Sequence, residues 1–148
     1  MPLASPSDTI SEPPAAVAAP AGKLTLLIVD DEEGPRQSLR IVFKHDYNVV
    51  VACNAEEAIV KAGGQPIHVA VLDIMMQGLS GVELLRELKE TNPTIQVVML
   101  TAYETLETAR QSLRYGASDY LNKPFDISSM RAAVARAAQK HVMAARLE

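Results

Sequence analysis

The sequence predicts a doubly wound α/β domain with a five-stranded parallel sheet. Five short strand-like segments recur along the chain, and four of them are almost continuously apolar, as is typical of parallel strands buried on both faces. Each is followed by a segment whose apolar residues have helical spacing. Strand and helix thus alternate five times, which predicts parallel strands joined by right-handed helical crossovers.

The strand-like segments are short and are separated by stretches long enough for a helix; they are residues 24–29, 48–52, 67–72, 95–100 and 118–122. The intervening helices are predicted from apolar faces, which in chain order are Leu39, Val42 and Phe43; Ala58, Ile59 and Ala62; Val82, Leu85 and Leu88; Leu106, Ala109 and Leu113; and Met130, Ala133, Val134 and Ala137.

Side chains that cap helices stand where three of these helices should begin. Asn54 with Glu57, and Ser80 with Glu83, have the spacing of capping boxes, and Asp126 can cap the last helix. Glycines, which favour helix ends, predict where the second and fourth helices stop: Gly63, Gly64 and Gly116.

Composition limits the class of protein. The 148 residues suit one domain, and a net charge of −4 without a basic run argues against a nucleic-acid surface. The single cysteine, Cys53, excludes an internal disulfide, fits a reducing compartment and is expected to be a small buried residue. The sequence lacks an apolar run long enough to cross a membrane and a signal-peptide pattern, so we expect a cytoplasmic protein that does not contact membranes.

Three regions are predicted along the chain. Residues 1–23 hold five of the nine prolines and lack apolar periodicity, which predicts a disordered Pro/Ala-rich tail. Residues 24–140 form the α/β domain. Residues 141–148 are expected to extend the last helix or to act as a linker, for example to an output domain.

Polar residues follow the predicted strands. Asp30 and Asp31 follow the first strand, Asp73 the third, Thr101 the fourth and Lys123 the fifth. Ligands of open α/β sheets bind at the carboxyl ends of the strands, so we expect these five side chains to meet at one edge. A lone Asp there is usually a helix cap and a lone Thr a turn residue, but five such residues at strand ends favour a site.

Three neighbouring carboxylates repel one another, by roughly 4 kcal/mol for a pair about 4 Å apart at an effective dielectric constant near 20. A cation relieves this repulsion, and oxygen ligands favour Mg²⁺. An Asp carboxylate can attack phosphorus to form an aspartyl phosphate, while a lysine ammonium and a threonine hydroxyl bind phosphoryl oxygens. The pattern therefore predicts phosphoryl chemistry at this edge.

The chain resembles the receiver domain of two-component response regulators from about residue 24 to residue 140. The segments that carry the resemblance are LIVDDEE (27–33), VLDIMMQGLSG (71–81), VVMLTAY (97–103) and DYLNKPF (119–125). It implies a flavodoxin-like (βα)5 fold with strand order 2-1-3-4-5.

The resemblance also implies roles for the site residues. Asp73 would accept the phosphoryl group, and Lys123 would pair with it. Asp30, Asp31 and Asp73 would bind Mg²⁺ together with the backbone carbonyl of Met75. Such a domain catalyses its own phosphorylation and dephosphorylation and is not a turnover enzyme.

The resemblance further implies a conformational switch. Thr101 would bind the phosphoryl group and move together with Tyr120, and the signal would leave through the fourth helix, fifth strand and fifth helix, residues 104–139. The implied partners are a sensor histidine kinase or a histidine phosphotransfer protein, an output domain or effector, often one that controls transcription, and a second copy of the chain on phosphorylation.

One residue departs from the family pattern. Gln77 stands where a proline is common after the phospho-acceptor, which predicts a looser loop and an altered phosphorylation rate or lifetime. Pro35 falls in the first turn of the first helix, where proline is tolerated.

Two other functions remain as alternatives. A phosphatase similar to the haloacid dehalogenases would use the same residue types, but its nucleophile follows the first strand in a D-x-D pattern, whereas this chain has adjacent Asp30 and Asp31. A nucleotide- or flavin-binding module needs a phosphate-binding loop after the first strand, where this chain has the acidic run DDEE. The three histidines, His45, His68 and His141, are expected to be structural or surface residues.

Overall fold

The computed structural model describes residues 22–76, 80–102 and 106–146. Of the tail predicted for residues 1–23, only Gly22 and Lys23 fall within these ranges, and Gln77 lies outside them.

Five strands and five helices alternate along the chain, as the sequence predicts. The strands are β1 (Thr25–Val29), β2 (Asn48–Ala52), β3 (Val69–Asp73), β4 (Gln96–Thr101) and β5 (Asp119–Asn122). The helices are α1 (Glu33–Phe43), α2 (Ala55–Gly64), α3 (Gly81–Thr91), α4 (Leu106–Arg114) and α5 (Ile127–Arg146). The sheet is parallel with the order β2-β1-β3-β4-β5, which confirms the predicted topology.

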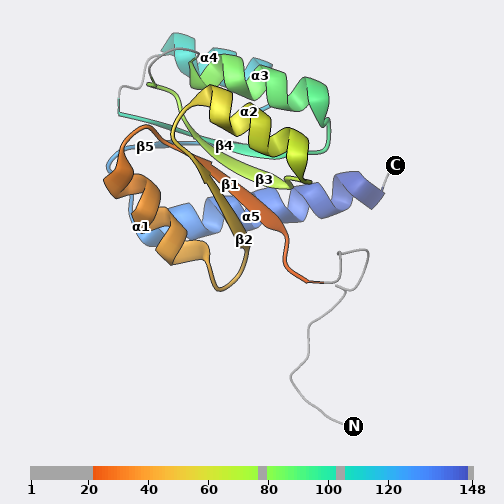
Figure 1. Ribbon diagram of the computed structural model, residues 1–148. Helices are drawn as coiled ribbons and strands as arrows, with labels where there is room; N and C mark the ends of the chain where they lie inside the picture. The colour runs from red at the N-terminus through yellow and green to blue at the C-terminus, as the bar shows by residue number, and fades with distance from the viewer. Residues whose placement is uncertain (1–21, 77–79, 103–105, 147–148) are drawn as a thin grey trace, which may run out of the picture.

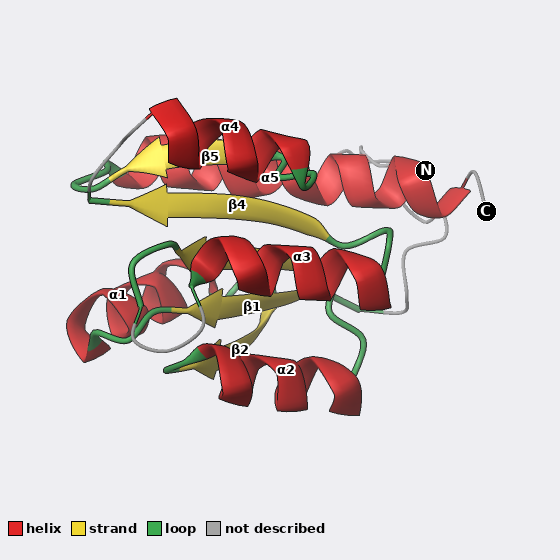
Figure 2. Cartoon of the chain, turned by 90° about the horizontal axis from the view of Figure 1, so that it is seen from above, coloured by secondary structure: helices red, strands yellow, loops and turns green. Residues whose placement is uncertain are grey.

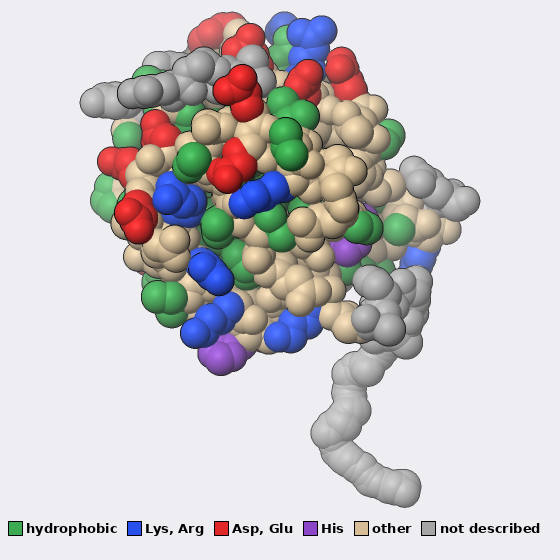
Figure 3. Space-filling view, in the orientation of Figure 1, with side chains coloured by type: hydrophobic (Ala, Val, Ile, Leu, Met, Phe, Trp, Pro, Cys, Tyr) green, Lys and Arg blue, Asp and Glu red, His purple; other side chains and the backbone are tan. Residues whose placement is uncertain are grey.

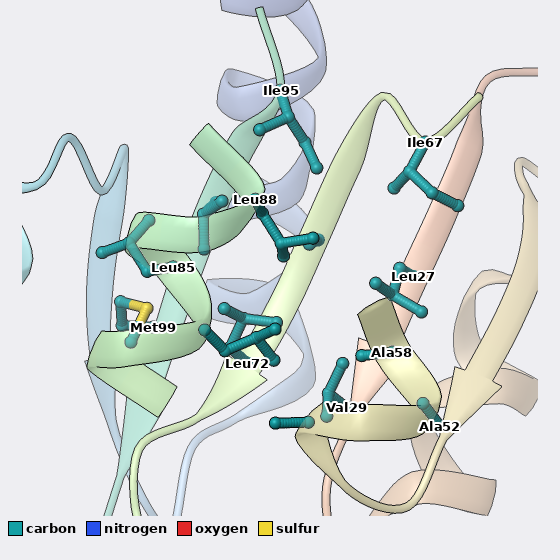
Figure 4. Close-up of a cluster of buried hydrophobic side chains, with 14 of the residues drawn as sticks. Leu27, Val29, Ala52, Ala58, Ile67, Leu72, Leu85, Leu88, Ile95 and Met99 are labelled. Atoms are coloured by element: carbon teal, nitrogen blue, oxygen red, sulfur yellow. The ribbon is translucent and has the colours of Figure 1, made fainter. Parts of the chain in front are cut away.

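Helices cover both faces of the sheet: α2, α3 and α4 lie on one face, and α1 and α5 on the other (Figure 1). Alternate residues of each central strand therefore enter two separate cores. Leu27, Val29 and Leu72 pack with Leu85 and Leu88 of α3 in the first core (Figure 4). Leu26, Ile28 and Val71 pack with α1 and α5 in the second core.

The edge strands are less buried than the central ones. β3 is buried throughout, whereas β5 and most of β2 are only half-buried, because each has a neighbouring strand on one side alone. The expectation that β2 is buried on both faces is therefore wrong, although its apolar character is explained by the helices that pack on it.

The predicted caps form with one variation. Ser80 and Glu83 make the full reciprocal capping box at the start of α3, and Asp126 accepts the N–H of Ser129 at 2.7 Å. Asn54 accepts the N–H of Glu57, but the Glu57 carboxylate accepts the N–H of Cys53 rather than that of Asn54. Gly116 follows α4 with a φ of +95°, a conformation that favours glycine.

Two predicted apolar faces are partly wrong. Leu113 of α4 is 64% exposed and Ile59 of α2 is 36% exposed. Among the α4 residues whose burial is described, 107–114, Ser112 is buried, so this part of the helix is rotated by one residue relative to the face read from the sequence. Cys53 is exposed rather than buried, because it lies in the turn between the end of β2 and the cap of α2.

The last helix runs through the predicted boundary at residue 140 without a break. It extends to Arg146, and His141 is buried against the domain. Among the described residues we find no helix that is long and apolar enough to cross a membrane. On the face shown in Figure 3, acidic side chains lie over the upper and left parts, and basic side chains lie at the top and over the lower half.

Candidate functional site

All strands point to the same edge of the sheet (Figure 2), and the acidic residues meet there. Asp30 follows β1 and Asp73 is the last residue of β3; both are buried, whereas Asp31 is exposed. One carboxylate oxygen from each of the three lies within 4.8 Å of the others. The predicted convergence of three acids is therefore confirmed.

Lys123 joins two of these acids. Its Nζ lies 2.9 Å from Oδ2 of Asp73 and 3.0 Å from Oδ2 of Asp30, and Oε1 of Glu32 is 3.8 Å away. The backbone brings the lysine there: its N–H donates to the carbonyl of Thr101 at 2.7 Å, which continues the pairing of β4 with β5. The peptide bond between Lys123 and Pro124 is cis.

Burial and charge act against each other at this cluster. Burial raises the pKa of Asp73, and the hydrogen bond and charge of Lys123 oppose this only partly, while the negative charge of Asp30 raises the pKa further. Burial alone would lower the pKa of Lys123, but the two aspartates outweigh it, so that its pKa is raised. One lysine does not fully compensate two buried carboxylates, which leaves the site attractive to a cation.

Backbone groups at the two described ends of the β3–α3 connection hold the Asp73 carboxylate and the start of α3 in place. Oδ1 of Asp73 accepts the N–H of Met75 at 3.1 Å, and the N–H of Gly81 donates to the carbonyl of Ile74 at 3.0 Å. A β-carbon on Gly81 would overlap the carbonyl oxygen of Asp73 and the Cα of Ile74. Glycine is therefore required where α3 begins, a role that the sequence analysis did not assign.

Asp30 is oriented by its own loop. Its Oδ1 accepts the N–H of Glu32 at 2.9 Å, and its carbonyl accepts a hydrogen bond from the guanidinium of Arg36 at 2.9 Å. Neither Glu32 nor Arg36 was assigned a role from the sequence. Glu32 could have been found from its place in the acidic run DDEE. The contact of Arg36 with Asp30 could not, because it depends on where helix α1 lies.

The two predicted switch residues sit at different depths. Thr101 is fully buried at the end of β4, at the same edge as the acids and in register with Asn122. Tyr120 is half-buried and packs against the first core, and its hydroxyl lies 3.3 Å from that of Thr108 on α4. Tyr120 thus links β5 to α4, and Thr108 is a contact that the sequence analysis missed.

A mostly apolar hollow of about 520 Å³ opens beside the cluster. Pro35 and Ser38 of α1 form one side, and Lys123, Pro124 and Phe125 form the other, with Ala102 between them. The hollow is open to solvent, and Lys123, which contacts Asp73, is one of the residues that line it.

The acidic cluster could hold a metal ion. Three carboxylates within 4.8 Å of one another are hard oxygen donors, and one of them is exposed, so that water can complete the coordination. A donor set of oxygens alone, without thiolate or imidazole, suits hard cations, a class that includes Mg²⁺, Ca²⁺ and Mn²⁺.

Residues 26–135 match the family described as "Response regulator receiver domain". The chain belongs to this family. The resemblance and the flavodoxin-like fold predicted from the sequence are thereby confirmed.

This receiver is similar to parts of longer proteins. It is 31% identical over 120 residues to a cyclic di-GMP phosphodiesterase of Thermotoga maritima, a match of 80% of this chain and 32% of that protein. It is 33% identical over 115 residues to the transcriptional regulatory protein ZraR of Escherichia coli, a match of 77% of this chain and 26% of the relative. The chain therefore spans about a quarter to a third of the length of these relatives.

The receiver is also similar to a solved structure of nearly its own size. A CheY-like response regulator receiver domain protein from Methanospirillum hungatei superimposes with a TM-score of 0.78 and 26% sequence identity. The match covers 81% of this chain and 97% of that one.

Proposed function

We propose that this receiver is a phosphorylation switch in which Asp73 accepts the phosphoryl group. The observation that carries the proposal is the contact of Asp73 with Lys123 at 2.9 Å, in a cluster that also holds Asp30 and Asp31. Asp73 attacks the phosphorus of a phosphohistidine, and the new bond to its carboxylate oxygen forms as the phosphorus–nitrogen bond breaks. The leaving imidazole takes up a proton from solvent.

The chain's own residues prepare this step. The N–H of Met75 holds Oδ1 of Asp73, which leaves Oδ2 as the attacking oxygen beside the Lys123 ammonium. Lys123 then pairs with the transferred phosphoryl group, and Asp30, Asp31, Asp73 and the carbonyl of Met75 are the proposed ligands of Mg²⁺. A bound Mg²⁺ supplies the positive charge that lets a carboxylate meet an anionic phosphoryl group.

The proposed output is a change in the face formed by α4, β5 and α5. Thr101 binds the phosphoryl group, and Tyr120 follows its movement. Since the Tyr120 hydroxyl contacts Thr108, a shift of Tyr120 acts directly on α4. The proposed donor of the phosphoryl group is a sensor histidine kinase or a histidine phosphotransfer protein, which can reach Lys123 at the hollow beside α1. On the output face, the proposed partner is an output domain, an effector protein or a second copy of the chain.

The phosphatase alternative is not supported by the relatives, and the nucleophile position argues against it. The candidate acceptor ends β3, whereas a phosphatase of the haloacid dehalogenase type carries its nucleophile after the first strand. We therefore propose a domain that turns over its own phosphoryl group. The cytoplasmic location and the absence of nucleic-acid contacts by this domain stay predictions.

Intact-mass measurement after incubation with Mg²⁺ and a small acyl phosphate tests the proposal. We expect a single phosphoryl adduct that is lost in Asp73→Asn and on chelation of the metal. Asp46→Asn, at an exposed aspartate between α1 and β2, is the matched control and should keep the adduct. An adduct that persists in Asp73→Asn contradicts the assignment of the acceptor.

A further inference from the structure

Two histidines that are 73 positions apart in the sequence meet at the end of the sheet opposite the acidic cluster. His68 immediately precedes β3, and His141 lies near the end of α5. Their ring centroids are 4.9 Å apart, with an angle of 56° between the ring planes. His141 is buried, and it is the last buried residue of α5 in the described part of the chain.

The backbone contacts of each ring dictate where its proton lies. Nδ1 of His141 is 2.9 Å from the carbonyl oxygen of Thr94, so this nitrogen carries a hydrogen and donates it. Nδ1 of His68 accepts the N–H of Thr25 at 2.8 Å, so this nitrogen must be unprotonated. The contact of His68 with β1 thus exists only while its ring is neutral, with the single proton on Nε2.

The same contacts disfavour a metal ion bridging the two rings. Neutral His68 keeps its only ring hydrogen on Nε2, so binding a metal there would require the anionic imidazolate or the loss of the contact with Thr25. The pair is better suited to proton binding than to metal binding.

We propose that His68 and His141 form a pH-sensitive clasp that holds the end of α5 against the sheet. The clasp is closed while His68 is neutral and loosens when His68 takes up a proton. Protonation places a hydrogen on Nδ1 against the Thr25 N–H and puts a charge beside the His141 ring. The residues that loosen are those of α5 from Ala138 to Arg146.

The surroundings of His68 favour the neutral form. Its pKa is lowered first by burial and then by the charge of His141. The basic side chains in the described part of the neighbouring elements are Lys23 ahead of β1, Lys89 of α3, and Arg131, Arg136, Lys140, His141 and Arg146 on α5. The turn before β4, residues 92–95, has no charged side chain of its own, but the Lys89 ammonium lies against it, 2.7 Å from the carbonyl oxygen of Ile95 and 3.3 Å from that of Pro93. Within the described residues, β1, residues 65–68, the turn 92–95 and α5 carry no Asp or Glu that could stabilise a protonated His68.

The sign of the pH dependence follows from the lowered pKa. The unfolded or opened form takes up a proton near the ordinary value of about 6.5, whereas the closed form does so at lower pH. The clasp therefore contributes its full stability above about pH 6.5 and loses it as the pH falls toward the pKa of the closed form. A single proton changes the opening equilibrium by at most about tenfold per pH unit.

Amide hydrogen exchange of the full chain at pH 7.5 and pH 5.5, corrected for the intrinsic rate, tests the clasp. In the wild type we expect protection of residues 138–146 to fall several-fold at the lower pH, while amides of Ala70 and Val71 in β3 keep theirs. His68→Gln, which can still accept the Thr25 N–H, should remove this pH dependence. His45→Gln, at the exposed histidine after α1, is the control and should behave as the wild type.

A wild-type chain whose α5 protection is the same at both pH values overturns the proposal, and so does a His68→Gln variant that keeps the fall. Should that variant not fold, the wild type supplies a second measurement by NMR. The ring signals of His68 and the amide signal of Thr25 are expected to titrate together with a midpoint below 6.5. Independent midpoints, or a Thr25 signal that does not titrate, would refute the clasp.

Discussion

The backbone of Gly81 lies directly against the carbonyl group of Asp73. This contact positions the start of α3 against the end of β3, where the candidate acceptor lies, and a methyl group at Gly81 would overlap backbone atoms of Asp73 and Ile74. Backbone cannot move aside as a flexible side chain can, so the backbone of these residues must shift.

Gly81→Ala is therefore expected to destabilise the domain by about 1–3 kcal/mol, the usual cost of overpacking a buried site, and to slow phosphorylation of Asp73. Urea unfolding and the rate of adduct formation measure the two effects. Gly63→Ala is the control, because a β-carbon there meets no atom within 4 Å, and replacing a helical glycine should stabilise by up to about 1 kcal/mol. Equal stability of the two variants would contradict the role given to Gly81.

Asp73→Asn is expected to stabilise the metal-free domain at pH 7. The reason is that burial and the charge of Asp30 raise the pKa of Asp73, so the charged carboxyl is less favourable in the folded chain than in the unfolded chain. Between the ordinary pKa of about 3.8 and the raised one, the folded state binds more protons, so wild-type stability rises as the pH falls through the raised value.

The advantage of Asp73→Asn should accordingly shrink as the pH falls through the raised pKa of Asp73, because the wild-type carboxyl then takes up a proton. It should also shrink on addition of Mg²⁺, because a metal that binds the folded wild type more tightly stabilises it more. Urea unfolding with and without chelator measures both trends. An Asp73→Asn variant that is less stable than the wild type at pH 7 without metal would show that the ion pair with Lys123 outweighs the cost of burial.

The acidic cluster could be predicted from the sequence because parallel strands place their carboxyl ends at one edge. Asp30, Asp73 and Lys123 are then neighbours whatever the rotation of the helices. The fold itself was predictable for the same kind of reason, since continuous apolar strands alternating with amphipathic segments allow few arrangements.

Contacts that depend on helix rotation or on distant elements could not be predicted in this way. On α4 the apolar spacing places Leu113 inward, but the structure buries Ser112. The residues that face inward are the small or polar Thr108 and Ser112, together with Tyr115 just after the helix, and apolar spacing cannot predict such a face. His68 and His141 each lack a sequence neighbour that would reveal their contact. The fit of Gly81 against Asp73 is likewise a matter of backbone approach rather than of pattern.

Ser112→Ala is expected to stabilise the domain by about 1 kcal/mol. Within the described residues, the Ser112 hydroxyl is fully buried and lacks a hydrogen-bond partner, so the wild type carries a desolvation cost that alanine removes. Ser129→Ala is the contrasting variant, because its hydroxyl donates to Asp126 at 2.9 Å in the cap of α5 and its loss should destabilise slightly. Thermal or urea unfolding measures the stability of both variants. A loss of stability in Ser112→Ala would mean that the Ser112 hydroxyl has a hydrogen-bond partner in solution.

Lys123→Met is expected to separate metal binding from phosphoryl transfer. The Lys123 ammonium lies between Asp30 and Asp73 and competes with a cation for their oxygens, so its removal should tighten Mg²⁺ binding several-fold while abolishing the phosphoryl adduct. Without metal the variant should lose about 3 kcal/mol of stability, because two buried carboxylates lose their common partner.

Lys44→Met, at an exposed lysine after α1, removes the same charge far from the cluster and should leave the Mg²⁺ affinity, the phosphoryl adduct and the stability unchanged. Calorimetric titration with Mg²⁺ measures the affinity. Unchanged affinity in Lys123→Met would mean that the metal and the lysine use different oxygens of the cluster, and the proposed ligand set would then have to exclude Oδ2 of both aspartates.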